Sequence, residues 1–171
     1  VSGLSKKALV FEKKAEVPSR TAFGALGLVN DDGVKQTHTA HGRQKRVLDL
    51  GETLTELLAE ALGAAQADIV FTSGATEAAA LALEGQGLAC AGIEHDAVRA
   101  WCAETLPVEA SGRVTVADPA GAALQLANSE TGVVQDLPPG LAVSDLTQAF
   151  GKIPFAFDWL GVEAGFVSAH K

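Results

Sequence analysis

Short apolar segments alternate along the chain with helix-like segments and glycine turns. Over 47–64, leucine and alanine recur at steps of three and four residues, which predicts an amphipathic helix ending near Gly63. A β-prone run at 69–71 follows, and a break at Ser73 and Gly74 leads into a second predicted helix over 75–84. The elements therefore follow the order strand, glycine turn, helix.

The same alternation continues to the end of the chain. It predicts an apolar strand at 88–93, a helix over about 96–105, and further strands at 113–116, 122–126, 141–143 and 165–167. Strands that alternate with helices favour a parallel sheet that is covered on both faces. We therefore expect an α/β protein of three layers, with a mainly parallel sheet between helices.

The N-terminal segment 1–40 does not join this pattern. It is rich in lysine, contains a cluster of turn residues at 30–33 and shows no strong periodicity. The 171 residues, 47% of them hydrophobic, suffice for one domain with a core. We therefore expect an N-terminal segment without a readable pattern and one domain over 41–171.

The charge and the cysteines narrow the classes of function. A net charge of −8 argues against nucleic acid and anionic membranes as partners. No apolar run reaches the roughly 18 residues of a membrane span, and no secretion signal is evident, so a cytoplasmic location is expected.

Neither an HxxxH nor a CxxC spacing occurs, so we expect no metal site. Cys90 and Cys102 are expected to be reduced packing residues.

The segment FTSGATE at 71–77 is the first candidate site. A strand ends there in a turn of small residues, and the backbone amides at the start of the next helix can bind a phosphate. Gly74 permits close approach, and the Thr76 hydroxyl could donate to a phosphate oxygen. Taken alone, the segment is better explained by an ordinary helix cap at Ser73 or Thr76, with Glu77 in the first turn, because short turns with glycine are common.

Three further side chains follow predicted strands, where ligands of α/β sheets gather. Asp145 could pair with a pyridinium nitrogen, although an Asp in a turn also caps locally. The imidazole of His95, at a strand-to-helix junction, could stack on a flat cofactor and carry protons. Lys171 could form a Schiff base with an aldehyde cofactor, beside phosphate donors at Ser168 and His170, or could simply be a solvated charge.

In this order, FTSGATE, IEHDAV, LANSETGVVQ, SDLTQAFGKIPF and SAHK resemble the cysteine desulfurase family of class V aminotransferase-like pyridoxal-phosphate (PLP) enzymes. The resemblance covers about 42–171 and implies part of the large domain of a fold-type I PLP enzyme. It also implies conversion of L-cysteine to L-alanine, with sulfur passed to an enzyme cysteine as a persulfide. A homodimer and a sulfur-acceptor or iron–sulfur scaffold protein are the implied partners. Because the resemblance stops at the PLP lysine, we expect an N-terminal fragment without turnover of its own.

The resemblance also assigns roles to individual residues. Lys171 would carry PLP, and His95 would stack on its ring as an acid and base. Asp145 would bind the ring nitrogen, and Gln148 would donate to the ring hydroxyl. The implied phosphate ligands are Ala75, Thr76, Ser168 and His170. Ser129 stands where the family has the second of two asparagines, which contacts the cofactor.

One departure from the family and two alternatives remain open. A proline-containing loop at 133–144 replaces a helix of the family, so a thinner layer is expected on that face of the sheet. One alternative is another class V PLP aminotransferase or lyase, such as a selenocysteine lyase-like enzyme, because such enzymes share the cofactor residues. The other is a non-catalytic α/β domain that binds a phosphate ligand or a partner chain, in which Lys171 never bonds a cofactor.

Overall fold

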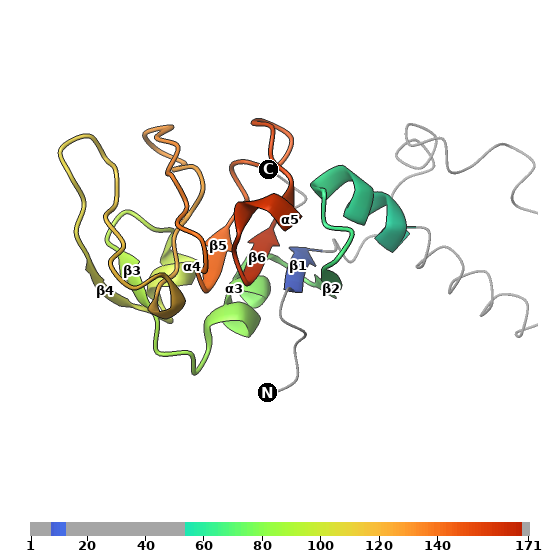
Figure 1. Ribbon diagram of the computed structural model, residues 1–171. Helices are drawn as coiled ribbons and strands as arrows, with labels where there is room; N and C mark the ends of the chain where they lie inside the picture. The colour runs from blue at the N-terminus through green and yellow to red at the C-terminus, as the bar shows by residue number, and fades with distance from the viewer. Residues whose placement is uncertain (1–7, 13–53, 169–171) are drawn as a thin grey trace, which may run out of the picture.

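A computed structural model of the chain describes residues 8–12 and 54–168 (Figure 1). Strands and helices alternate through most of this range, which confirms the predicted α/β class. The strands are β1 (Ala8–Glu12), β2 (Asp68–Thr72), β3 (Ala89–Ala91), β4 (Ala103–Leu106), β5 (Val143–Asp145) and β6 (Ala164–Val167). The helices are an unlabelled one over 54–62, α3 (Ala75–Leu83), α4 (Asp96–Arg99) and α5 (Phe157–Leu160), with a 3₁₀ turn at Pro119–Gly121.

The strands form one parallel layer in two hydrogen-bonded parts. The larger sheet has the order β2-β1-β6-β5, the smaller one pairs β3 with β4, and every strand pair in both is parallel. The extended segment 122–126 joins the two parts, because Ala122 bridges to Ala89 of β3 and Ala123 bridges to Val143 of β5. Parallel pairing brings the C-terminal ends of the strands to the same edge of the layer.

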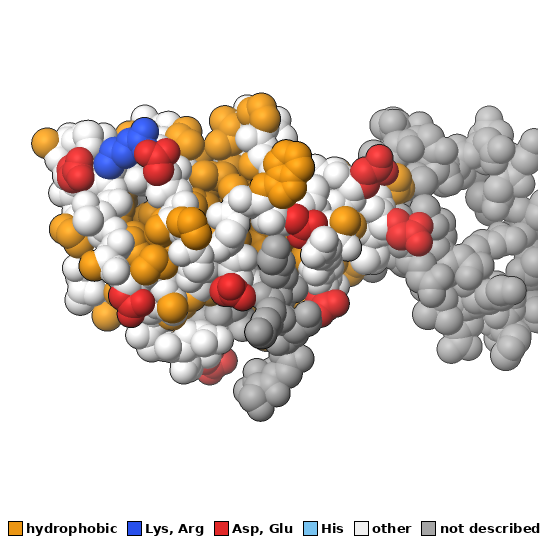
Figure 2. Space-filling model, in the orientation of Figure 1, with side chains coloured by type: hydrophobic (Ala, Val, Ile, Leu, Met, Phe, Trp, Pro, Cys, Tyr) orange, Lys and Arg blue, Asp and Glu red, His pale blue; other side chains and the backbone are white. Residues whose placement is uncertain are grey.

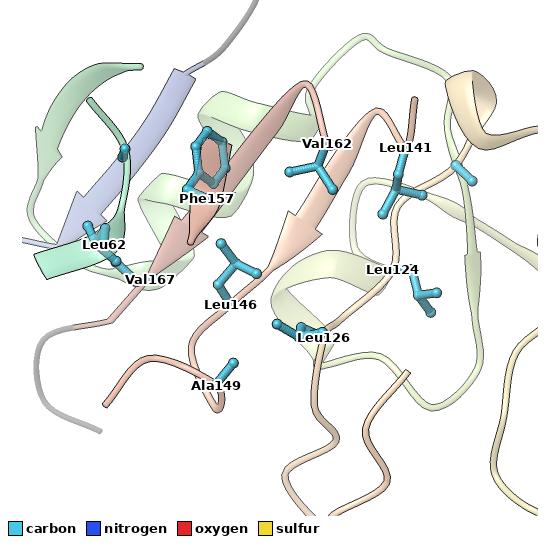
Figure 3. Packing of buried hydrophobic residues seen from close by; sticks show 11 residues of the cluster. Leu62, Leu124, Leu126, Leu141, Leu146, Ala149, Phe157, Val162 and Val167 are labelled. Atoms are coloured by element: carbon cyan, nitrogen blue, oxygen red, sulfur yellow. The ribbon is translucent and has the colours of Figure 1, made fainter. Parts of the chain in front are cut away.

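Apolar side chains cover the two faces of this layer in two separate clusters. Phe166 and Val167 are neighbours in β6, yet Phe166 packs with α3 and α4 while Val167 packs with α5 and the helix over 54–62. Figure 3 shows the second cluster, where the labelled side chains of Leu62, Leu146 and Phe157 converge over the sheet. Helices therefore lie on both faces, as the sequence predicted.

Glycine ends the first described helix as predicted. Gly63 follows the helix over 54–62 with a φ of 59°, a left-handed conformation that favours glycine at this position. A Cβ atom there would lie 2.6 Å from the Cβ of Ala156, so the close contact with the chain ahead of α5 also requires glycine. The predicted start of this helix lies outside the described residues.

Several predicted elements differ from the observed ones. The helix predicted over 96–105 is wrong in length, because α4 ends at Arg99 and 103–106 form β4 alongside β3. Pairing with a neighbouring strand there overrides the helical propensity of Ala103 and Glu104. The strand predicted at 113–116 is reduced to a single bridge between Val108 and Val114, and the strand predicted at 141–143 runs over 143–145 instead.

Two observations concern segments that gave weak signals in the sequence. The loop at 133–144 contains no helix before β5, as predicted from its prolines. β1 was not predicted, although it lies between β2 and β6 and pairs with both. One strand of the larger sheet thus comes from the segment 1–40, while the predicted domain boundary near residue 40 lies outside the described residues.

Candidate functional site

The candidate residues follow strands whose C-terminal ends share one edge of the sheet. The FTSGATE turn follows β2, Asp145 is the last residue of β5, and Ser168 comes directly after β6. His95 lies in the turn between β3 and α4, next to the segment 122–126. This edge is where α/β proteins bind their ligands. His170 and Lys171 lie outside the described residues, so their predicted roles stay predictions.

The turn before α3 leaves backbone amides at the helix start. Gly74 is the N-cap in an extended conformation, and no side chain caps it, so the alternative of an ordinary cap by Ser73 or Thr76 is not what the structure has. The first helical hydrogen bond runs from the amide of Ala78 to the carbonyl of Gly74, at 3.0 Å. The amides of Ala75 and Thr76 precede it and have no acceptor within the helix, which suits an anion.

Glu77 fixes the shape of this turn. Its carboxylate accepts hydrogen bonds from the hydroxyl of Ser73 at 2.5 Å and from the amide of Ser73 at 2.6 Å. Both bonds lower the pKa of Glu77. The Thr72 hydroxyl donates to the carbonyl of Gly74 at 3.1 Å. The strand end and the first turn of α3 are therefore held together before any ligand binds.

His95 is the N-cap of α4 and has an exposed ring. Its Nδ1 atom accepts a hydrogen bond from the amide of Ala97 at 3.1 Å. A neutral imidazole with an accepting Nδ1 carries its proton on Nε2, so the cap fixes both the tautomer and the orientation of the ring. The ring is thus presented to ligands with a donor at its outer nitrogen.

The turn that carries His95 is tied to the segment 122–128. The carbonyl of Ile93 accepts two side-chain hydrogen bonds, from Nε2 of Gln125 at 2.9 Å and from Nδ2 of Asn128 at 3.0 Å. The buried carboxyl group of Glu94 accepts a third bond from the amide of Gln125 at 3.0 Å. These contacts hold the two residues that precede His95 and so fix the position of its turn.

Asp145 lies close to His95 although the two are distant in sequence. Burial raises the pKa of Asp145, and hydrogen bonding from Thr147 together with the nearby imidazole of His95 opposes the rise. The amide of Thr147 donates to Oδ1 of Asp145 at 2.9 Å. The structure thus brings an imidazole and a carboxyl group to the same site, with the free N-terminal amides of α3 at the same edge of the sheet.

The remaining described candidates differ in their surroundings. Gln148 is half-buried, and its Oε1 accepts a hydrogen bond from Nζ of Lys152. Ser168 is buried. Ser129 is exposed, and its hydroxyl donates to Oε1 of Glu130 at 3.2 Å. Its neighbour Asn128 is the buried residue of that loop, so the predicted contact between Ser129 and a cofactor stays a prediction.

Sequence reasoning did not single out Glu94, Gln125 or Asn128. These side chains position the His95 turn through hydrogen bonds rather than through a recognisable motif. The one available signal was an acidic residue directly before a histidine at a strand-to-helix junction. Glutamate is rarely buried unless its carboxyl group is paired or hydrogen-bonded, so this signal alone does not predict the buried position of Glu94.

The two cysteines are packing residues within the described structure. Both are free thiols, with Cys90 buried in β3 and Cys102 partly buried ahead of β4 rather than on the predicted helix. Burial raises the pKa of Cys90 to about 12 and also raises the pKa of Cys102. Since the thiolate is the nucleophile, both residues are poorly suited to accept sulfur.

A thiol-reactivity measurement checks this conclusion. At pH 8 we expect Cys90 in the folded Cys102→Ser chain to react with an aromatic disulfide reagent about a thousandfold more slowly than after unfolding, because its thiolate fraction is that much smaller. The reaction rate of Cys102 is measured in the same way in the Cys90→Ser chain. Equal reaction rates before and after unfolding would show that burial does not suppress the reactivity of the Cys90 thiol.

The described surface agrees with the acidic composition. Figure 2 shows scattered acidic side chains on the visible face, little basic surface, and apolar side chains between them. Within 8–12 and 54–168, no three metal-binding side chains gather into a group that could hold a metal ion. None of the helices in this part of the chain is both long and apolar enough to cross a membrane.

Together these features define an α/β protein whose candidate ligand site lies at the C-terminal edge of a parallel sheet. Comparison with curated proteins is more specific. The chain is 32% identical over 157 residues to a cysteine desulfurase of Frankia sp. (strain EuIK1), covering 67% of this chain and 38% of that protein. It is 30% identical over 155 residues to the cysteine desulfurase IscS of Dictyoglomus turgidum, covering 70% and 39%. The chain is therefore related to the cysteine desulfurase family, as its motifs predicted.

The match to these relatives is partial. A putative cysteine desulfurase NifS of Bacillus subtilis is 29% identical over 188 residues, with 88% of this chain and 46% of the relative covered. The chain thus spans less than half the length of the curated relatives it matches. Neither a protein-family model nor a solved structure matches the chain.

Proposed function

We propose that this chain provides most of the PLP-binding part of a cysteine desulfurase. The observation that carries the proposal is that His95, Asp145 and the N-terminal amides of α3 all follow strands at the C-terminal edge of one parallel layer. The relationship to proteins named cysteine desulfurase supports the choice of reaction. An imidazole, a partly buried carboxyl group and free helix amides match what a flat, phosphorylated, nitrogen-containing cofactor requires.

The described residues would divide the work of holding PLP, whose ring supplies an electron sink when bound. Asp145 would bind the ring nitrogen and keep it protonated, because a cation there offsets the burial of the carboxylate. His95 would lie against the ring and exchange protons through Nε2. The amide oxygen of Gln148 already accepts a hydrogen bond from Lys152, so the amide NH₂ of Gln148 would donate to the ring hydroxyl.

The phosphate would bind at the start of α3. The free amides of Ala75 and Thr76 and the positive end of the helix dipole favour an anion there. Ser168, His170 and Lys171 come after β6, whose C-terminal end lies at the same edge. In this proposal Ser168 and His170 add donors to the phosphate, and Lys171 attaches the cofactor covalently.

The substrate in this proposal is L-cysteine, which yields L-alanine while the sulfur passes to an enzyme cysteine. A sulfur-acceptor or iron–sulfur scaffold protein and a second copy of the complete enzyme would be the partners. Neither Cys90 nor Cys102 has the thiolate character that the sulfur-accepting residue needs. The chain alone is therefore expected to release no alanine from L-cysteine.

Covalent trapping tests the cofactor site. We expect borohydride reduction of the chain mixed with PLP to label Lys171 preferentially, because a desolvated lysine amine reacts more readily than an exposed one. Peptide mass spectrometry locates the label. In Lys171→Ala the total label falls to the background of the other lysines, whereas the control Lys14→Ala, which removes a lysine without a role in this proposal, keeps it. Equal labelling of all lysines, unchanged in Lys171→Ala, would contradict the proposal.

A further inference from the structure

The turn after β3 interrupts a regular hydrogen-bond ladder. The amide of Ala123 donates to the carbonyl of Ala89 at 2.8 Å, so in a continuous parallel ladder the amide of Gln125 would donate to Ala91. The Ala91 carbonyl instead accepts from the amide of Glu94, at 3.1 Å, because the chain turns there. Oε1 of Glu94 takes its place and accepts from Gln125 at 3.0 Å. The Glu94 side chain thus continues the ladder in place of backbone.

The surroundings of this carboxyl group favour its neutral form. Glu94 is only 5% exposed, and its Oε2 atom is buried without a hydrogen-bond partner among the described residues. No ion pair of the described structure includes Glu94. A carboxylate with one donor and no cation is costly to bury, whereas a carboxylic acid is much less so.

The ionisable groups that act on Glu94 are themselves acids. They are Asp145 at the end of β5, Cys90 in β3 and Cys102 ahead of β4. The imidazole of the adjacent His95 is engaged at Nδ1 with Ala97. Burial, and then the Asp145 carboxylate, raise the pKa of Glu94 to about 8, while the bond from Gln125 opposes the rise.

We propose that Glu94 is a positioning residue that works as a neutral acid, holding the His95 turn on segment 122–126 and leaving Asp145 as the site's partly buried negative charge. Loss of its proton would place a second negative charge near Asp145, in surroundings where burial disfavours that charge, directly before His95. The inference concerns residues that the structure describes, and it stands whether or not Lys171 binds a cofactor.

The ionisation of Glu94 can be measured directly in the unmodified chain. In protein labelled with ¹³C at the glutamate carboxyl group, we expect the Glu94 resonance to be that of an acid at pH 7 and to titrate near pH 8. The resonance that disappears in Glu94→Gln gives the assignment. A Glu94 carboxyl group that is already ionised at pH 6 would overturn the proposal, and this result does not depend on whether the variant folds.

The positioning role has its own readout. The ring-proton resonance of His95, assigned by its loss in His95→Gln, should show an inflection that coincides with the titration of Glu94. Glu94→Gln keeps a neutral group of the same shape and should remove that inflection. The control Glu163→Gln, which changes an exposed carboxylate before β6, should keep it. An inflection that persists in Glu94→Gln would show that Glu94 does not control His95.

The pH dependence of stability tests the direction of the Glu94 pKa shift independently. The folded-state pKa of Glu94 lies above the ordinary value of 4.5, so its contribution is complete below pH 4.5 and is lost as the pH rises towards 8. The unfolding constant of the wild-type chain relative to Glu94→Gln should rise about tenfold per pH unit in this window. A constant ratio would contradict a buried neutral acid.

Discussion

Phe157→Ala is expected to destabilise the chain by about 3–5 kcal/mol, the cost of removing a fully buried aromatic ring. Phe157 begins α5, is 0% exposed and lies in the cluster of Figure 3. A Cβ atom on Gly165 of β6 would lie 2.9 Å from the Phe157 ring and 2.9 Å from Leu146. Helix, sheet and loop therefore meet at this ring, and the cavity left by alanine cannot easily collapse. Urea unfolding followed by circular dichroism measures the loss.

Trp159 in the same short helix provides the control. It is 89% exposed, so Trp159→Ala should change the free energy of unfolding by less than about 0.5 kcal/mol. Both variants remove a large aromatic side chain from α5, and only its burial differs. Similar losses in the two variants would mean that α5 does not dock on the sheet through Phe157.

Asn128→Ala is expected to cost about 2–3 kcal/mol, because it removes a buried side chain that is the partner of several part-buried backbone groups at once. Nδ2 of Asn128 donates to the carbonyl of Ile93, next to the His95 turn. Its Oδ1 accepts from the amides of Glu130 and Thr131, at 2.9 Å and 2.8 Å, and from the Thr131 hydroxyl at 3.0 Å. The same urea titration measures the effect.

The neighbouring position separates this role from a general effect on the loop. Ser129 is exposed, and within the described loop its hydroxyl donates to the adjacent Glu130, so Ser129→Ala should stay within about 0.5 kcal/mol of the wild type. Asn128→Asp keeps the acceptor but sets a carboxylate oxygen against the Ile93 carbonyl, so it should also destabilise the chain. Equal stability of Asn128→Ala and Ser129→Ala would refute the assignment.

Elements with strong local signals could be predicted from the sequence. The end of the first helix at Gly63, the strand β2, the helix α3 and the strand β6 each depend on periodicity or on a glycine turn within a few residues. The strands β1 and β4 were missed because they depend on distant partners. Ala103 and Glu104 are good helix formers, and they form a strand because they pair with the edge of β3.

Some residues of the candidate site could likewise be predicted from the sequence, and others could not. The order of the motifs singled out His95 and Asp145, and the structure places them near each other. The network around them could not be predicted, because the partners of Glu94 and Asn128 are set by how segment 122–128 packs beside β3. Sequence patterns do not predict such contacts in a parallel sheet, because the residues in contact are far apart along the chain.

The position of β1 has a consequence for the order of folding. This strand is synthesised first, yet one of its two partners, β6, is among the last described residues, and the other begins only at Asp68. Pairings between such distant segments are slow to form, because the loop entropy is lost before the contacts are gained. The larger sheet can therefore close only after β6 has left the ribosome, and until then the edge of β1 that pairs with β6 remains open to wrong pairing.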